Sequence, residues 1–324
     1  MTGHERLPPG RACAVAVWWC SPEGGGRANA RRRLIALVGP SVRFVAVGDV
    51  MVDVMAAEAP RPGSRVHASV HIRAGGSAVN AAAWAAALSA SAVVVGSVGS
   101  DPAGELVARV LACRGIEAHL ARDSDLPTGV AVAVGAGASA GVVASPGASA
   151  RLAPEDVPEP LDGDALLVSG FSLLQSGSAA GARAALDRFA GRWAAVDLAS
   201  ASLAAAAASR LDEATTGANV ILATAEEARA VTGAEPEEAA RALAVRFLVA
   251  CVKLGEHGAV AAQGTRIERT AAEPVVRRSR FGAGDAFAAA LLVALAADES
   301  LDRALSLACE TGARAAASAD GWPA

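Results

Sequence analysis

Short apolar segments alternate with Ala-rich segments along most of this chain. Residues 44–48 form a continuous apolar run that ends in a glycine, which is typical of a strand buried on both faces. Further strands are predicted at residues 92–98, 165–168, 193–196, 220–222 and 249–254. Helices are predicted at residues 78–88, 104–113, 179–189, 225–231, 237–247 and 286–297. This order predicts an α/β fold with a mostly parallel central sheet and helices on both of its faces.

Two segments interrupt this alternation and indicate β structure alone. Residues 65–73 alternate strictly, with Val66, Ala68, Val70 and Ile72 on one face and Arg65, His67, Ser69, His71 and Arg73 on the other. Residues 129–134 and 141–144 predict a hairpin. We expect a small sheet apart from the main one, serving as a lid or a dimer contact. If the basic face covers a site, it favours an anionic ligand; the alternative is that it faces solvent.

The first 41 residues differ from the rest. They contain Pro8-Pro9, three consecutive glycines and three consecutive arginines, and we expect a disordered arm or a wrongly assigned N-terminus. The apolar stretch at residues 12–20 superficially resembles a signal peptide, but Glu5 and the prolines before it argue against one. We therefore expect the folded domain to cover residues 42–324.

Composition and charge exclude several classes of protein. Hydrophobic residues make up 53% of the 324 residues and charged residues 19%, which indicates a folded chain. The net charge of −4 provides no basic field for nucleic acid. The longest apolar run, residues 286–297, is shorter than the roughly 20 residues of a membrane span. Five scattered cysteines without a CxxC pair favour reduced thiols in a cytoplasmic protein over a zinc site or disulfides.

The segment Gly282-Ala283-Gly284-Asp285 carries the strongest chemical signal. It directly precedes a predicted helix, so its backbone amides and the positive end of the helix dipole would form an anion hole. Asp285 would lie beside this hole, where a carboxylate can take a proton from an attacking hydroxyl. An ordinary helix start with an Asp in its first turn would have the same sequence.

Three weaker candidates lie elsewhere in the chain. Gly75-Gly76 and Asn80 sit at a predicted strand-to-helix turn, and Asp53 follows the first strand, where a carboxylate can bind sugar hydroxyls. Lys253, Gly255 and Gly258 belong to a glycine-bracketed turn that suits a nucleotide. An ordinary turn, a solvated loop Asp and a plain hairpin are the respective alternatives.

Taken in order, these segments resemble the ribokinase/PfkB family of carbohydrate and nucleoside kinases from residue 42 to the end. The resemblance rests on VAVGDVMVDV, AGGSAVNAAAWAAAL, GSVGSDPAGELVARVLACRGIEA, PTGVAVAV, SPGASARLAPEDV, VKLGEHGAV and GAGDAF. It implies a ribokinase-like fold and an ATP- and Mg²⁺-dependent phosphotransferase that acts on a hydroxyl of a sugar or nucleoside. The two β regions, residues 62–74 and 128–145, would be the family's lid, through which a homodimer is also conceivable.

The resemblance also implies roles for individual residues. Asp285 would be the general base, and the amides of Gly282, Ala283 and Gly284 would hold the charge on the transferred phosphoryl group. The acceptor would be bound by Asp53, Gly75, Gly76 and Asn80. The nucleotide would be bound by Lys253, Gly255 and Gly258.

Three positions depart from the family's pattern. Ser279-Arg280-Phe281 stands where the family writes D-T-x before G-A-G-D, so we expect little dependence on a monovalent cation, with Arg280 as a conceivable substitute for its charge. Thr224 replaces the Asn of N-x-x-E, while Glu227 is retained as an indirect Mg²⁺ contact. Ser149 replaces the Asn of P-G-A-N. These changes keep open an alternative, a weakened family member that serves as a sugar- or nucleoside-binding or regulatory protein.

Overall fold

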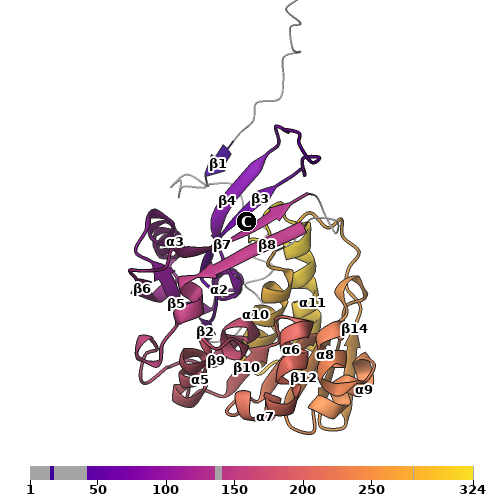
Figure 1. The fold of residues 1–324 in the computed structure, drawn as a ribbon. Coiled ribbons are helices and arrows are strands. Elements are labelled where there is room, and N and C mark those ends of the chain that lie inside the picture. The colour runs from indigo at the N-terminus through magenta and orange to yellow at the C-terminus, as the bar shows by residue number, and fades with distance from the viewer. Residues whose placement is uncertain (1–14, 18–41, 136–140, 280, 324) are drawn as a thin grey trace, which may run out of the picture.

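A computed structural model of the protein describes residues 15–17, 42–135, 141–279 and 281–323 (Figure 1). Its main sheet has nine strands in the order β14-β13-β12-β11-β10-β9-β2-β5-β6. The parallel strands are β12, β11, β10, β9, β2, β5 and β6. Strands β13 and β14 are antiparallel and lie at one edge of the sheet. Their bounds are β2 Arg43–Val47, β5 Ser91–Gly99, β6 Glu117–Asp123, β9 Ala165–Ser169, β10 Trp193–Asp197, β11 Val220–Thr224, β12 Val249–Lys253, β13 Ala259–Gln263 and β14 Arg266–Thr270.

Helices cover both faces of this sheet, which confirms the predicted fold class. One hydrophobic core lies under α2 (Ser77–Ala87), α3 (Pro102–Cys113), α10 (Ala283–Ala296) and α11 (Leu301–Ala317). A second core lies on the opposite face under α4 (Gly170–Leu174), α5 (Ala179–Arg188), α6 (Ala201–Ala207), α7 (Leu211–Ala214), α8 (Ala225–Thr232) and α9 (Pro236–Leu243). The predicted helix at residues 237–247 therefore ends at Leu243, because residues 244–247 form a turn into β12.

Helix α10 is buried along nearly its whole length, since it packs against both α2 and α11. This explains the apolar run that the sequence shows there. Small alanine side chains let α2 and α10 approach the sheet closely. Among the described residues, no helix has the length and hydropathy needed to cross a membrane.

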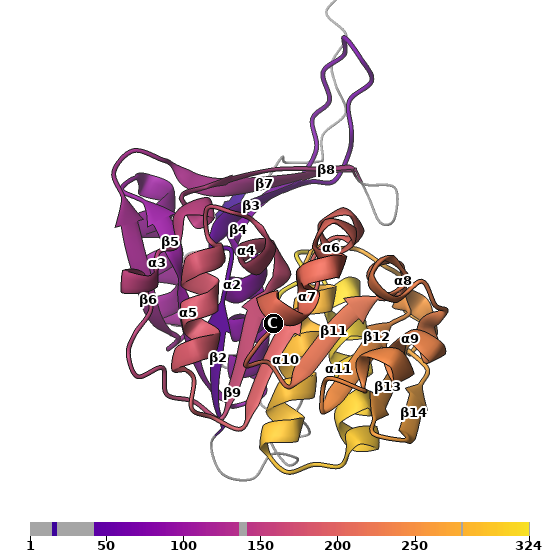
Figure 2. The ribbon, with the colours of Figure 1, turned by 60° about the horizontal axis from the view of Figure 1, so that its bottom comes forward.

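The second, smaller sheet has five strands in the order β1-β4-β3-β7-β8 and lies to one side of the main sheet (Figure 2). The predicted hairpin is present as β7 (Thr128–Val134) and β8 (Gly141–Gly147). Strand β3 (Met51–Ala56) pairs with β4 (Val70–Gly75). The strand predicted at residues 65–73 begins only at Val70, opposite Ala56, the last residue of β3.

Of the predicted N-terminal arm, the structure describes only β1 (Val15–Val17). This short strand pairs in parallel with β4, through Val15 opposite Val70 and Val17 opposite Ile72. The rest of residues 1–41 lies outside the described residues.

The register of the main sheet brings polar residues to one edge. Ser169, Asp197, Thr224 and Lys253 are the last residues of β9, β10, β11 and β12 respectively. Asp197 is paired with Ser169, and Thr224 with Lys253, so the four residues form a row across the carboxyl ends of parallel strands. Ligands of open α/β sheets bind at this edge.

Candidate functional site

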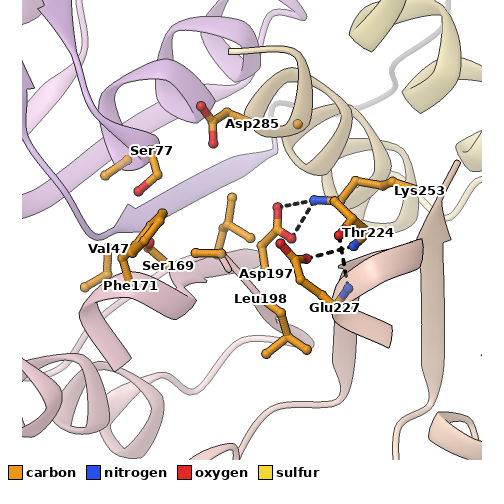
Figure 3. Close-up of a pocket in the computed structure, with 14 residues that line it drawn as sticks. Val47, Ser77, Ser169, Phe171, Asp197, Leu198, Thr224, Glu227, Lys253 and Asp285 are labelled. Carbon is orange, nitrogen blue, oxygen red and sulfur yellow. Dashed lines mark hydrogen bonds and ion pairs between the residues drawn. The ribbon is translucent and has the colours of Figure 1, made fainter. Parts of the chain in front are cut away.

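A cavity of about 220 Å³ lies over this row of strand ends (Figure 3). Its polar lining residues are Ser77, Ser169, Asp197, Thr224, Glu227, Lys253 and Asp285. The hydroxyls of Ser77 and Ser169 are buried and form no hydrogen bond to the described residues. Buried hydroxyls normally have a hydrogen-bond partner. These two hydroxyls are therefore candidates to form hydrogen bonds with a bound ligand.

Lys253 and Asp197 form an ion pair in the floor of the cavity. The Lys253 Nζ lies 2.6 and 2.7 Å from the two carboxylate oxygens of Asp197. Burial lowers the pKa of Lys253, but the attraction of Asp197 outweighs it and leaves the pKa raised. The lysine is therefore fully charged at neutral pH. Its Nζ would lie 3.7 Å from a Cβ atom at Gly284, so the ammonium faces the first turn of α10.

Thr224 and Glu227 form a capping box at the start of α8. The Thr224 Oγ1 accepts a hydrogen bond from the Glu227 backbone N–H, and Glu227 Oε2 accepts one from the Thr224 backbone N–H at 2.8 Å. Burial raises the pKa of Glu227, against the opposing effect of Lys253. The T-x-x-E spacing therefore has a structural role, and it leaves Glu227 Oε1 unused by these bonds.

Asp285 lies in the first turn of α10 and lines the same cavity. Gly282 precedes the helix with φ of +85°, a left-handed conformation that favours glycine. The first backbone amides of a helix have no acceptor within it, so Ala283, Gly284 and Asp285 present their N–H groups at this end. Burial raises the pKa of Asp285 to about 7, with the Asn80 hydrogen bond opposing this and Asp197 adding to it.

A buried polar network connects Asp285 to the smaller sheet. Asn80, in α2, donates through Nδ2 to Asp285 Oδ2 at 2.9 Å and accepts at Oδ1 from Arg73 Nη1 at 2.7 Å. Arg73, on β4, is also 2.9 Å from Asp53 Oδ2, on β3. Both members of that ion pair are at least 94% buried, since Arg73 is 6% exposed and Asp53 is 1% exposed.

Gly75 is required by this network. A Cβ atom at Gly75 would lie 2.2 Å from the Asp53 carboxyl carbon. Gly76 adopts φ of +86°, and its Cβ would meet the Asp49 carbonyl oxygen at 2.3 Å. The two glycines therefore permit the close packing that places Asp53 beside α2.

The structure brings most of the predicted site residues together, but not all. Gly255 and Gly258 form the turn between β12 and β13 and do not line the cavity. Ser149 is buried, and its hydroxyl bonds to the Val50 backbone, so its observed contacts are structural. Arg280 lies outside the described residues.

The basic face predicted for residues 65–73 does not exist as one surface. Arg65 and His67 are exposed and lie before β4, His71 is half-buried, and Arg73 is buried against Asp53. The strict alternation predicts one continuous strand over residues 65–73, whereas only residues 70–73 of that segment enter the sheet.

Sequence reasoning missed Ser77 and Ser169 in the lining of the cavity, and also Asp197 and Trp322. Asp197 follows a predicted strand directly, and that position was the available signal. Trp322 donates through Nε1 to Asn80 Oδ1 at 2.8 Å, and no local pattern marks it. Among the described residues, no group of three or more His, Cys, Asp or Glu side chains could hold a metal ion.

Comparison with known proteins identifies the family of this chain. The model of the pfkB family carbohydrate kinases matches residues 43–320. No curated protein sequence matches the chain. Among solved structures, adenosine kinase from Sinorhizobium meliloti is similar, with 21% identity, a TM-score of 0.77 and coverage of 88% of this chain and 96% of that one.

Two further solved structures are similar over most of the chain. Fructokinase from Vibrio cholerae O395, in fructose-, ADP- and calcium-bound form, has 25% identity, a TM-score of 0.72 and coverage of 86% and 94%. Aminoimidazole riboside kinase from Salmonella enterica, complexed with aminoimidazole riboside and an ATP analog, has 21% identity, a TM-score of 0.70 and coverage of 86% and 95%. The family match and the ribokinase-like fold agree with the resemblance in the sequence: the chain belongs to the pfkB family of carbohydrate kinases.

Proposed function

We propose that this kinase transfers the γ-phosphoryl group of ATP to a hydroxyl of a sugar or nucleoside, with Asp285 as the general base. The observation that carries this proposal is the position of Asp285. Its carboxyl group lies in the first turn of α10, at the point where the cavity and the buried network meet. A pKa of about 7 suits a group that must take a proton near neutral pH.

In the proposed reaction the acceptor oxygen forms a bond to the γ-phosphorus while the bond from that phosphorus to the β,γ-bridging oxygen breaks. The acceptor proton passes to Asp285, and ADP leaves with the bridging oxygen. The amides of the Gly282–Gly284 turn and the ammonium of Lys253 would stabilise the charge on the transferred group. We assign this role to Lys253 because its ammonium group faces the first turn of α10.

Nucleotide binding is supported by the cavity and by the relatives. The fructokinase structure contains ADP, and the riboside kinase structure contains an ATP analog. In this chain the unpaired hydroxyls of Ser77 and Ser169 line the cavity with Lys253. We assign this cavity to the phosphate end of the nucleotide. Gly255 and Gly258 shape the turn after β12 that positions Lys253, rather than lining the cavity themselves.

Magnesium fits this site only in company with the nucleotide. Mg²⁺ is commonly held by one or two carboxylates together with phosphate oxygens and water. Glu227 offers one carboxylate oxygen outside its capping bond, and Lys253 occupies both oxygens of Asp197. Glu227 is therefore the residue that would hold the ion, directly or through water. The bound ion would neutralise charge on the phosphates.

The acceptor is assigned to the side of Asp285 that faces the smaller sheet. Asp53, Gly75, Gly76 and Asn80 meet there, and β3 and β4 bring Asp53 and Arg73 over the start of α2. The smaller sheet would cover the acceptor and exclude water, which would otherwise consume ATP. Because Asp53 already neutralises Arg73, this side carries no free positive charge from Arg73.

The test is ATP-dependent product formation across a panel of hexoses, pentoses, sugar acids, sugar phosphates and nucleosides. We expect turnover of one class, with a loss of about 10²–10⁴-fold in the Asp285→Ala variant. ADP binding by calorimetry to the same variant shows whether its nucleotide site is intact. If wild-type protein binds sugar or nucleoside but never phosphorylates it, the chain is instead a binding or regulatory member of the family.

A further inference from the structure

Asn80 has a fixed orientation in the buried network. Its Oδ1 lies 2.7 Å from Arg73 Nη1 and 2.8 Å from Trp322 Nε1. A guanidinium group and an indole N–H can only donate hydrogen bonds. The atom of Asn80 that faces both of them must therefore be its oxygen, and the amide nitrogen must face Asp285.

Trp322 is itself held firmly against this network. Trp322 is 5% exposed, and two guanidinium groups lie over its indole ring, with Arg73 Cζ 5.1 Å and Arg114 Cζ 4.5 Å from the ring centroid. The neighbouring Gly321 carbonyl accepts a hydrogen bond from Trp84 Nε1 at 2.9 Å. The indole N–H therefore has one fixed direction, toward Asn80.

The orientation of Asn80 determines what Asp285 experiences. With Nδ2 toward Asp285, the amide donates to Oδ2 at 2.9 Å and favours the charged carboxylate. If the amide were reversed, its oxygen would face a carboxylate oxygen and favour the protonated acid. An acid that keeps its proton cannot accept one from the substrate.

We infer that Arg73 and Trp322 are positioning residues for the general base, which they act on through the side-chain amide of Asn80. This inference rests on the proposed function of Asp285. It gives Asn80 a role beyond contact with the acceptor, since its Oδ1 accepts from Arg73 and Trp322 and its Nδ2 donates to Asp285. It also assigns a function to a tryptophan far from the glycine turn in sequence.

Other charges act on Asp285 and must be separated from this effect. Asp197 and Asp53 raise its pKa and Lys253 lowers it, and Arg73 attracts it directly as well as through Asn80. Asp320 faces Arg73 in turn. Removing Arg73 would therefore raise the pKa of Asp285 through charge alone. Trp322 carries no charge, so its removal reports on the hydrogen bonds.

The experiment is a mutant cycle read by the titration of the Asp285 carboxyl carbon in ¹³C-labelled protein, with Asp285→Asn used to assign the signal. The double variant Arg73→Met/Trp322→Phe is compared in wild-type protein and in an Asn80→Leu background. We expect its upward pKa shift to be larger by about 0.5 unit when Asn80 is present. Equal shifts in the two backgrounds would overturn the inference, because the effect would then be charge alone.

Trp322→Phe by itself keeps the Arg73–Asp53 ion pair and guards against a variant that fails to fold. It should shift the pKa upward by a smaller amount with Asn80 present and not at all in the Asn80→Leu background. Arg114→Met is the matched control, since it removes the other guanidinium over the same ring and should leave the pKa unchanged. An equal shift in Arg114→Met would mean that loosening of the ring, not the loss of its N–H, is the cause, and would also overturn the inference.

The titration requires no turnover, so it separates this inference from the proposed function. If wild-type protein phosphorylates no acceptor, the proposed function fails, while the cycle still shows whether Arg73 and Trp322 control Asp285. If turnover is found, the acid limb of the kcat–pH profile should move upward in the same variants by the same amount. A limb that stays in place while the carboxyl pKa moves would overturn the part of the inference that concerns catalysis.

Discussion

The ammonium group of Lys253 lies within 2.7 Å of both carboxylate oxygens of Asp197. Asp197 ends β10 and Lys253 ends β12, so the pair spans the intervening strand β11 and joins residues 56 positions apart in the chain. Their side chains are only 14% and 16% exposed, so each would be a poorly solvated charge without the other. This pair therefore stabilises the floor of the cavity as well as placing a positive charge beside α10.

Replacement of Lys253 by Met should destabilise the fold, because it leaves Asp197 as an unpaired and mostly buried charge. We expect a loss of about 2–4 kcal/mol in the free energy of unfolding. The double variant Lys253→Met/Asp197→Asn should regain a part of this loss, since no charge is then stranded. Urea denaturation of the three proteins measures both effects. A single variant as stable as wild type would contradict the prediction.

The rate of the reaction should rise with pH as Asp285 loses its proton. The pKa of about 7 predicts a kcat that increases across neutral pH and levels off above pH 8. Initial rates at saturating substrates between pH 5 and 9 measure this profile. A rate that is already level at pH 5.5 would mean that the base has an ordinary carboxylate pKa.

The same raised pKa predicts a pH-dependent stability. Folding favours the protonated form of Asp285, so its contribution is fully present below pH 3.8 and is lost as the pH rises through about 7. Asp285→Asn carries no charge and should escape this loss. Its melting temperature should exceed that of wild type by about 2 °C or more at pH 8, and by less at pH 5. A difference independent of pH would show that Asp285 is not desolvated.

Gly75→Ala should disturb the acceptor side of the site. Its Cβ would lie 2.2 Å from the carboxyl carbon of Asp53, which is buried and held by Arg73, so the carboxyl group must move. We expect a loss of about 1–3 kcal/mol in stability and a raised KM for the acceptor, with the KM for ATP changed less. Gly141→Ala is the matched control, because none of the described residues has an atom within 4 Å of its Cβ position.

Thr224→Ala should weaken the start of α8. The variant loses the hydroxyl that accepts from the Glu227 N–H and should lose about 1 kcal/mol of stability. Thr224→Asn retains a capping oxygen and should remain as stable as wild type. The midpoints of urea denaturation compare the three proteins. An unstable Asn variant would show that the cavity cannot accept the larger side chain.

Potassium should have little effect on the rate. The Ser279 hydroxyl is engaged with the N–H and carbonyl of Phe281, and its carbonyl accepts from Arg277 Nε. Substitution of potassium by tetramethylammonium at constant ionic strength should therefore leave kcat unchanged. A marked fall in kcat would show that this segment binds the ion despite the replaced Asp and Thr.

The sequence alone predicted the elements whose patterns are local. The apolar run of β2, the Ala-rich helix α2 and the glycine turn before α10 all follow from neighbouring residues, because periodicity and glycine conformation are short-range properties. It predicted the strand at residues 65–73 too long, since strand length depends on where its partner β3 ends. It did not identify α11 or β14, although their main partners, α10 and β13, directly precede them in the chain.

The sequence predicted some residues of the site, and only the structure identified the contacts of others. The sequence placed Asp285 and its glycine turn, because a helix start and its acidic residue are adjacent in the chain. Only the tertiary structure paired Asn80 with Asp285, 205 residues away, and with Trp322, 242 residues away. A single sequence shows which residues are apolar and where the chain turns. Side-chain hydrogen bonds between distant residues depend instead on which helices and strands pack against one another in the folded protein.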